Sequence, residues 1–217
     1  MSVNGRRRVV ITGIGAVTPL GNDAETSWQN LLAGESGAAE ITQFDSSDYF
    51  VHFACEVKDF DPSNWIERKQ ARRMDRFAQL ILAAARQAEA DSGIDIAPAA
   101  DRIGASIATG IGGIKSFQDC YDTLIERGPD RVNPFAIPCI IPNMGAGWVS
   151  MELGTRGPLS SECTRMELLP VWNVRSASIG FSPRRIVPVS FLTGMTMVRL
   201  MSAPSMRASS TLHKFPS

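Results

Sequence analysis

Residues Ile103–Gly113 read IGASIATGIGG, an uncharged run of small and β-branched side chains that ends in a cluster of glycines. A continuous run of this kind, without alternation of polar and apolar residues, is typical of a strand buried on both faces. We therefore expect a strand from Ile103 to Ala108, followed by a tight turn at Gly110–Gly113 that lets the backbone approach a pocket. Val9–Ile11, closed by Gly13, predicts a second buried strand.

Two helices are expected between these strands. Asn22 and Glu25 have the spacing of a capping box, Gly34 supplies a stop, and the apolar face is Trp28, Leu31 and Leu32. A longer helix is expected to start near Met74 and to end at Gly93, with apolar positions at helical spacing: Phe77, Ile81, Ala84, Ala85 and Ala88. The order strand, helix, helix, strand predicts the α/β class, with a mixed or parallel sheet covered by helices.

The glycine motifs do not indicate a nucleotide cofactor. A dinucleotide fingerprint that starts at Gly13 and Gly15 would need a third glycine where the chain has Thr18. The Gly110–Gly113 cluster lacks the Lys-Ser or Lys-Thr pair of a phosphate loop at the required distance, because Lys115 comes too early. We therefore expect no cofactor.

Five motifs in order along residues 6–164 resemble the beta-ketoacyl-ACP synthases, the elongating condensing enzymes of type II fatty acid synthesis. They are Arg7–Gly21 (RRVVITGIGAVTPLG), Arg73–Phe77 (RMDRF), Gly110–Gly113 (GIGG), Asn133–Pro138 (NPFAIP), and Asn143–Trp148 with Gly154–Thr164. The resemblance implies a thiolase-like layered α/β/α/β/α fold. Residues 1–164 would form its N-terminal half, an incomplete domain that stops before the nucleophile.

The resemblance also locates the nucleophile of the family and shows that it is missing here. The family reads Thr-Ala-Cys at a strand-to-helix turn, whereas this chain reads Thr164, Arg165 and Met166. A thioether is permanently alkylated and cannot become the thiolate that accepts an acyl group. Cys163 is an alternative nucleophile, but its offset of three residues favours a small packing residue.

The remaining chemistry of the family is also incomplete in this sequence. Its condensation uses two histidines that stabilise an oxyanion, and neither His52 nor His213 matches a family motif. By resemblance, Ile111 would form the floor of the acyl tunnel and Phe135 would reach that of a partner subunit. The alternative is that Ile111 and Phe135 are ordinary core residues.

The sequence changes character after Thr164. Residues 168–217 contain no Asp or Glu, and prolines interrupt runs that show no sustained period. We expect residues 165–217 to be a non-family tail, frameshifted or artificially joined, or disordered. A divergent extension and a basic interaction segment are the alternatives. Its scattered charges make a poor nucleic-acid footprint, and no stretch of the chain is a credible membrane span.

Composition agrees with a globular protein of the cytoplasm. The chain has 217 residues, 44% of them hydrophobic, and a formal net charge of zero. Cys55, Cys120, Cys139 and Cys163 show no CxxC spacing, which predicts buried reduced thiols and no metal site.

Two functional hypotheses follow. The first is a chain of beta-ketoacyl-ACP synthase lineage that is catalytically inactive as written, with acyl carrier protein and acyl thioesters as partners by resemblance. The second is a non-catalytic partner of an active condensing enzyme, similar to the chain-length factors. Either would form a homodimer or a heterodimer. Loss of the second half would leave apolar helix faces and sheet edges open, which predicts aggregation or dependence on a partner.

Overall fold

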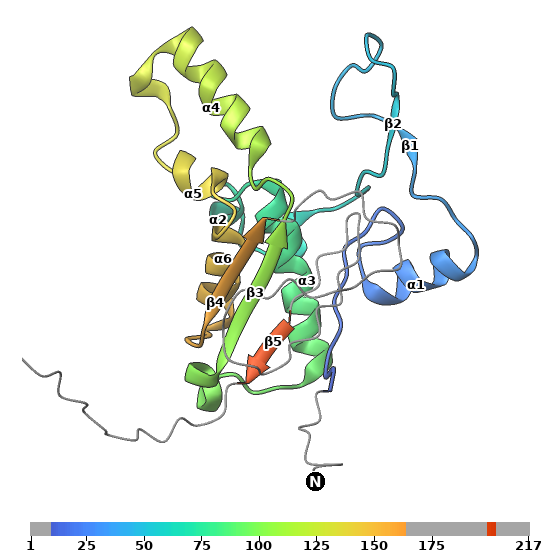
Figure 1. The fold of residues 1–217 in the computed structure, drawn as a ribbon, viewed down its shortest axis with the longest axis vertical. Coiled ribbons are helices and arrows are strands. Elements are labelled where there is room, and N and C mark those ends of the chain that lie inside the picture. Colours follow the sequence, from blue (N-terminus) through green and yellow to red (C-terminus); the bar gives the residue numbers. More distant parts are fainter. Residues whose placement is uncertain (1–9, 164–198, 203–217) are drawn as a thin grey trace, which may run out of the picture.

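The computed structural model describes residues 10–163 and 199–202 (Figure 1). Its helices are α1 (Ala24–Leu32), α2 (Arg68–Ala71), α3 (Arg76–Ser92), α4 (Ile114–Arg127), α5 (Ala136–Ile140) and α6 (Met144–Leu153). Its strands are β1 (Ala39–Glu40), β2 (Phe53–Ala54), β3 (Ile103–Thr109), β4 (Leu159–Cys163) and β5 (Arg199–Ser202). Short 3-10 helices are η1 (Pro62–Asn64), η2 (Ala97–Arg102) and η3 (Pro129–Arg131).

The main sheet has the strand order β4-β3-β5 and is mixed, as the sequence predicts. β3 and β4 run parallel, from the pair Ala105 and Leu159 to the pair Thr109 and Cys163. β5 lies antiparallel on the other edge of β3. β1 and β2 form a separate two-stranded antiparallel ribbon, which projects from the body in Figure 1.

The hydrophobic core lies between β3, α3 and α6. Ile103, Ala105 and Ile107, on one face of β3, pack in the same cluster as Leu82 of α3 and Val149 of α6. Leu82 and Val149 are both completely buried. The predicted strand over 103–108 is confirmed as β3, but its expected burial on both faces holds only in part, because Ser106 is half-buried and Ala108 is exposed.

The predicted long helix is also confirmed, as α3. Asp75 caps its N-terminus by accepting a hydrogen bond from the Phe77 amide, and Gly93 ends it in the left-handed conformation with φ 60°. Ala84, Ala85 and Ala88 are buried, while Phe77 is only half-buried. The small alanine side chains allow neighbouring backbone to approach α3 closely.

The predicted strand at Val9–Ile11 was wrong for the residues that the structure describes. Val10 and Ile11 belong to no strand and are 64% and 72% exposed, and Val9 lies outside the described residues. A strand needs a neighbouring strand to pair with. The edge of β3 opposite β4 is paired with β5 and not with Val10 and Ile11. The chain is held to α3 further on, where the Ile14 and Ala16 amides donate to Asp91 and Gln87 at 2.8 and 3.1 Å.

The first helix forms, but its cap differs from prediction. Asp23, not Asn22, is the N-cap and accepts the Thr26 amide at 2.7 Å, because the helix begins at Ala24 and the Asp23 carboxylate therefore lies over the first turn. The predicted apolar face is open: Trp28, Leu31 and Leu32 are 54%, 55% and 63% exposed. No described element covers this face. No helix in the described ranges is long and apolar enough to cross a membrane.

Candidate functional site

The candidate site lies where the parallel strands β3 and β4 end together. Thr109 and Cys163, the last residues of the two strands, face each other in the register. The segments that follow the two strands therefore both begin at the same, carboxyl-terminal edge of the sheet. In open α/β sheets this carboxyl edge is where ligands bind.

A tight glycine turn leaves β3 at this edge, as the sequence predicts. The Gly112 amide donates to Thr109 Oγ1 at 3.2 Å, and Gly112 has a φ of +77°. A Cβ on Gly113 would lie 2.0 Å from the Cys139 carbonyl oxygen, so this position requires glycine. The Gly113 amide donates to the Ile140 carbonyl at 3.0 Å. The amides of Gly112 and Gly113 therefore donate within the protein.

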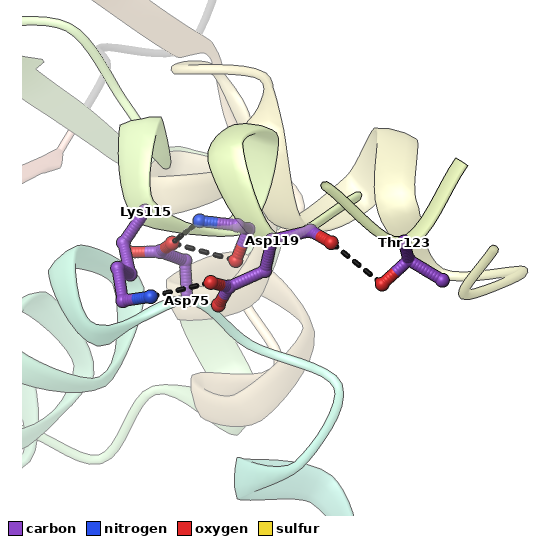
Figure 2. Close-up of polar contacts among 5 residues, drawn as sticks. Asp75, Lys115, Asp119 and Thr123 are labelled. Carbon is purple, nitrogen blue, oxygen red and sulfur yellow. Dashed lines mark hydrogen bonds and ion pairs between the residues drawn. The ribbon is translucent and has the colours of Figure 1, made fainter. Parts of the chain in front are cut away.

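A buried carboxylate ties the turn to the start of α3. Asp75 Oδ2 accepts the Ser116 amide at 3.0 Å and the Ser116 hydroxyl at 2.6 Å, across the first turn of α4 (Figure 2). Figure 2 also shows the Lys115 ammonium against the Asp119 carboxylate, and Thr123 donating to the Asp119 carbonyl. The hydrogen bond and the charge of Asp119 raise the pKa of Lys115 above its ordinary value. Asp75 therefore fixes the helix that begins where the turn ends.

The segment that carries Phe135 is attached to the same region. The Arg73 guanidinium lies 4.6 Å from the centre of the Phe135 ring, a cation–π contact. The Phe135 amide donates to Asn133 Oδ1 at 2.9 Å. The buried Cys139 thiol donates to the Arg73 carbonyl at 3.2 Å. Burial, followed by the charge of Asp75, raises the pKa of Cys139, so this thiol is poorly suited to act as a nucleophile.

The two residues expected in an acyl tunnel are partly open to solvent. Ile111 is 62% exposed and Phe135 is 36% exposed. A cavity of about 380 Å³ is found elsewhere, between the β1–β2 ribbon and the start of α3. Neither Ile111 nor Phe135 lines it; its walls include Glu40, Thr42, Glu56, Lys58, Phe60 and Arg76. The acyl-pocket role of Ile111 and Phe135 stays a prediction.

The candidate catalytic residues are only partly described. Cys163 is the last residue of β4, and Met166 and His213 lie outside the described residues. His52 is exposed and donates from Nδ1 to the Ser46 carbonyl at 2.9 Å, far along the chain from the sheet edge. In the described ranges no cluster of histidine, cysteine and carboxylate side chains could hold a metal ion. The expectation of buried thiols was wrong for Cys55, which is exposed because it directly follows the short β2 strand of the projecting ribbon.

An exposed cationic cluster at α2 and the start of α3 was missed by the sequence analysis. It comprises Arg68, Lys69, Arg72, Arg73 and Arg76. Arg76 contacts Phe60 and donates to the Val57 carbonyl at 3.1 Å, and Arg73 contacts Phe135. Within the described part of the chain, Arg68, Lys69 and Arg72 form no ion pair. The high density of basic residues between positions 68 and 76 of the sequence could have predicted this cluster.

A mixed sheet with parallel strands ending beside a glycine turn, and with α3 and α6 on one face, defines an α/β protein of the thiolase-like ketosynthase fold. Residues 6–164 match the beta-ketoacyl synthase N-terminal domain. The chain belongs to the beta-ketoacyl synthase family.

Individual relatives agree with this assignment. The chain is 47% identical over 159 residues to 3-oxoacyl-[acyl-carrier-protein] synthase 2 of Staphylococcus aureus strain COL, covering 73% of this chain and 38% of that protein. It is 45% identical over 160 residues to the protein of the same name from Synechocystis, with the same coverage of 73% and 38%. The chain thus spans about two fifths of the length of the curated relatives it matches.

Solved structures give the same fold. The ishigamide ketosynthase/chain length factor superposes with a TM-score of 0.66 at 30% identity, over 74% of this chain and 40% of that chain. A beta-ketoacyl synthase from Burkholderia phymatum superposes with a TM-score of 0.59 at 25% identity, over 71% of this chain and 39% of that chain.

Proposed function

We propose that this chain carries the N-terminal half of a 3-oxoacyl-ACP synthase and is catalytically inactive as written. The family reaction is the decarboxylative Claisen condensation of an enzyme-bound acyl group with malonyl-ACP. In this proposal, residues 10–163 supply the sheet edge and the surrounding segments against which an acyl thioester would lie. The nucleophile that would accept the acyl group is missing.

The position of Met166 carries the proposal. β4 ends at Cys163, at the sheet edge where the Gly110–Gly113 turn also begins. In the sequence, residue 166 comes soon after Cys163, where the resemblance puts the family cysteine, and it is methionine here. A cysteine there would be acylated when its thiolate attacks the thioester carbonyl and the carrier thiol leaves. A methionine sulfur has no proton to lose and cannot form a stable thioester.

His52 does not supply the oxyanion donor that the family takes from a histidine. The sequence contains only His52 and His213. His52 lies on an exposed loop, where its Nδ1 is already bonded to a backbone carbonyl. An oxyanion donor must lie about 3 Å from the reacting oxygen, and nothing brings His52 to the sheet edge.

The cationic cluster at α2 supports a carrier protein as partner. Three of its side chains, Arg68, Lys69 and Arg72, are exposed and form no ion pair with described residues. A further member, Arg73, contacts Phe135, so the cluster adjoins the segment expected at the acyl pocket. An acidic carrier surface would be attracted to such a cluster, and the attraction would weaken with salt. We extend the proposal to acyl carrier protein docking at this cluster.

The test is acyl transfer from acyl-ACP, followed by the intact mass of the protein. We expect no adduct on the unchanged chain and none on Cys163→Ala. The variant Arg165→Ala/Met166→Cys restores the family residues and should gain one acyl group, on residue 166. An adduct on the unchanged chain that disappears in Cys163→Ala would refute the proposed inactivity.

Docking is tested separately by measuring the affinity of acyl-ACP for the chain at two salt concentrations. Arg68→Ala/Lys69→Ala/Arg72→Ala should weaken binding severalfold at low salt and have little effect at high salt. Lys58→Ala/Arg127→Ala/Arg131→Ala, which also removes three exposed charges but from outside the cluster, is the matched control. Equal losses in the two variants would contradict a specific docking surface.

The second candidate function is a non-catalytic partner of an active condensing enzyme, and the open apolar faces favour it. On α4, Ile114, Phe117 and Tyr121 are all more than half exposed, and on α1 so are Trp28 and Leu31. Exposed patches of this kind mark protein interfaces. Co-expression with an active beta-ketoacyl-ACP synthase decides between the two: a stable heterodimer with altered product length supports the partner role, and separate elution of the two chains contradicts it.

A further inference from the structure

The edge of β3 opposite β4 is closed by a strand from the tail. β5 pairs antiparallel with the first half of β3, in a register that runs from Ile103 opposite Ser202 to Ser106 opposite Arg199. Residues 199–202 lie outside the stretch that matches the family, which ends at residue 164. The tail therefore contributes part of the described sheet.

This edge would be costly to leave open. Ile103, Gly104 and Ala105 are buried, and a buried backbone N–H or C=O without a partner costs free energy comparable to a lost hydrogen bond. The N-terminal apolar segment does not supply the partner, because Val10 and Ile11 are in no strand and Ile14 and Ala16 are bonded to α3. Within the described residues, β5 alone pairs with this edge of β3.

The sequence around β5 has the features of an edge strand. Arg199–Ser202 contains no proline or glycine, whereas Pro204 follows shortly after it. Edge strands are commonly short, carry a positive charge and are bounded by proline, because these features discourage pairing with further chains. An arginine at the first position and a proline just beyond the last fit that pattern.

The geometry points to an intramolecular edge cap: Arg199–Ser202 occupies a strand-addition site on β3 that accepts an extended peptide, and these four residues are a structural part of this domain. The site recognises backbone, since strand addition depends on main-chain hydrogen bonds. This inference does not rest on the condensing function, because it concerns the opposite edge of β3 and residues outside the family match.

The test uses hydrogen exchange of the full-length chain and two proline variants, Leu200→Pro and Met201→Pro. Successive amides of a strand point to opposite sides, so one of these two amides faces β3 and the other faces away. We expect the inward-facing variant to reduce protection of the Ile103–Ser106 amides between about two- and tenfold, the range for a hydrogen bond of ordinary net strength. The other variant is its matched control, and unchanged protection of α3 shows that the fold is intact.

Rescue in trans completes the test. A synthetic peptide of residues 197–204, added to the destabilised variant, should restore protection at Ile103–Ser106. The same peptide with proline at the inward-facing position should not. Unchanged β3 protection in both proline variants, or failure of the peptide to restore it, would overturn the edge-cap proposal. Neither result depends on acyl transfer, so this test and that of the proposed function fail independently.

Discussion

Asp75 and Ser116 are joined by two hydrogen bonds across 41 residues of chain, with the Asp75 carboxylate accepting both the amide and the hydroxyl of Ser116. The other oxygen of Asp75 accepts the Phe77 amide at 3.2 Å. A single buried carboxylate therefore caps α3 and holds the first turn of α4. Through α4 it also fixes the glycine turn at the carboxyl edge of the sheet.

Removing this carboxylate should strongly destabilise the chain. We expect Asp75→Ala to lower the free energy of unfolding by about 3 kcal/mol, because it removes a helix cap and leaves the Ser116 amide without its partner. Ser116→Ala removes only the hydroxyl bond and should cost about 1 kcal/mol. Urea denaturation of both variants and of the double variant measures the coupling. A strictly additive double variant would show that the two residues do not act together.

Close approach of the N-terminal segment to α3 should make Gly15 intolerant of a side chain. A Cβ at this position would lie 2.0 Å from the Ala84 carbonyl oxygen, in the backbone of a helix that cannot move aside. Gly15→Ala should therefore cost about 3 kcal/mol. Gly110→Ala is the control, since a Cβ at that exposed glycine meets nothing within 4 Å and should change stability by less than about 0.5 kcal/mol. Equal effects of the two substitutions on the urea midpoint would contradict the close contact.

Replacing one glycine of α6 by alanine should stabilise the protein. A Cβ on Gly147 would make only ordinary contact with Met144, at 3.5 Å, and alanine is the better helix former. Gly147→Ala should raise the melting temperature, by a gain of about 0.5–1 kcal/mol. Gly145→Ala is the matched comparison in the same helix, because its Cβ would lie 3.0 Å from Ile81 and 3.3 Å from Ile107 in the core. A larger gain at Gly145 than at Gly147 would refute this account.

The pKa of Glu56 should respond to Thr42. The Thr42 hydroxyl, donating at 2.6 Å, is the main cause that lowers the pKa of Glu56 below 4.5. A carboxylate whose pKa is lower in the folded than in the unfolded state stabilises the fold at pH values above the unfolded-state pKa. That contribution is lost as the pH falls through the folded-state pKa. Thr42→Val should raise the pKa of Glu56, measured by NMR titration, and narrow the acidic range in which this loss occurs. Ser47→Ala, which affects Asp45, is the control and should leave Glu56 unchanged.

Two ion pairs should differ in their contribution because their burial differs. Glu152 accepts Arg86 at 2.9 Å and also accepts Gln70, and its side chain is 19% exposed. Asp101 accepts Arg156 at 2.8 Å, but its side chain is 79% exposed. Glu152→Ala should cost about 1–2 kcal/mol, whereas Asp101→Ala should cost less than about 0.5 kcal/mol. Similar shifts of the urea midpoint in the two variants would show that burial does not set their strength.

The sequence predicts well those helices and strands that are specified by residues close together in the chain. α3 forms where the apolar spacing places it and ends at Gly93, because capping residues and periodicity act within a few positions of the chain. β3 is predicted by its uncharged run, and the turn after it by its glycines. The site residues expected by resemblance are less well defined, because Met166 lies outside the described residues and Ile111 and Phe135 do not line the cavity beside the β1–β2 ribbon.

The pairing partner of each strand was not predicted. Val10 and Ile11 have the composition of a buried strand but belong to none, and the edge of β3 is taken by β5 from a tail that shows no strand pattern. Trp28 is exposed, in agreement with the expectation of open apolar helix faces, since burial requires a covering element and none is described. A sequence pattern indicates whether a side chain prefers to be buried, while its actual burial depends on which elements pack against it.

The sequence by itself determined the family, the α/β class, and the main helix and strand, because motifs and local periodicity are written residue by residue. Only the tertiary structure decided that Asp75 holds Ser116, that Gly15 lies against Ala84, and that the tail closes β3. Each of these joins residues far apart in the chain, and such contacts follow from how the elements pack together rather than from any local pattern.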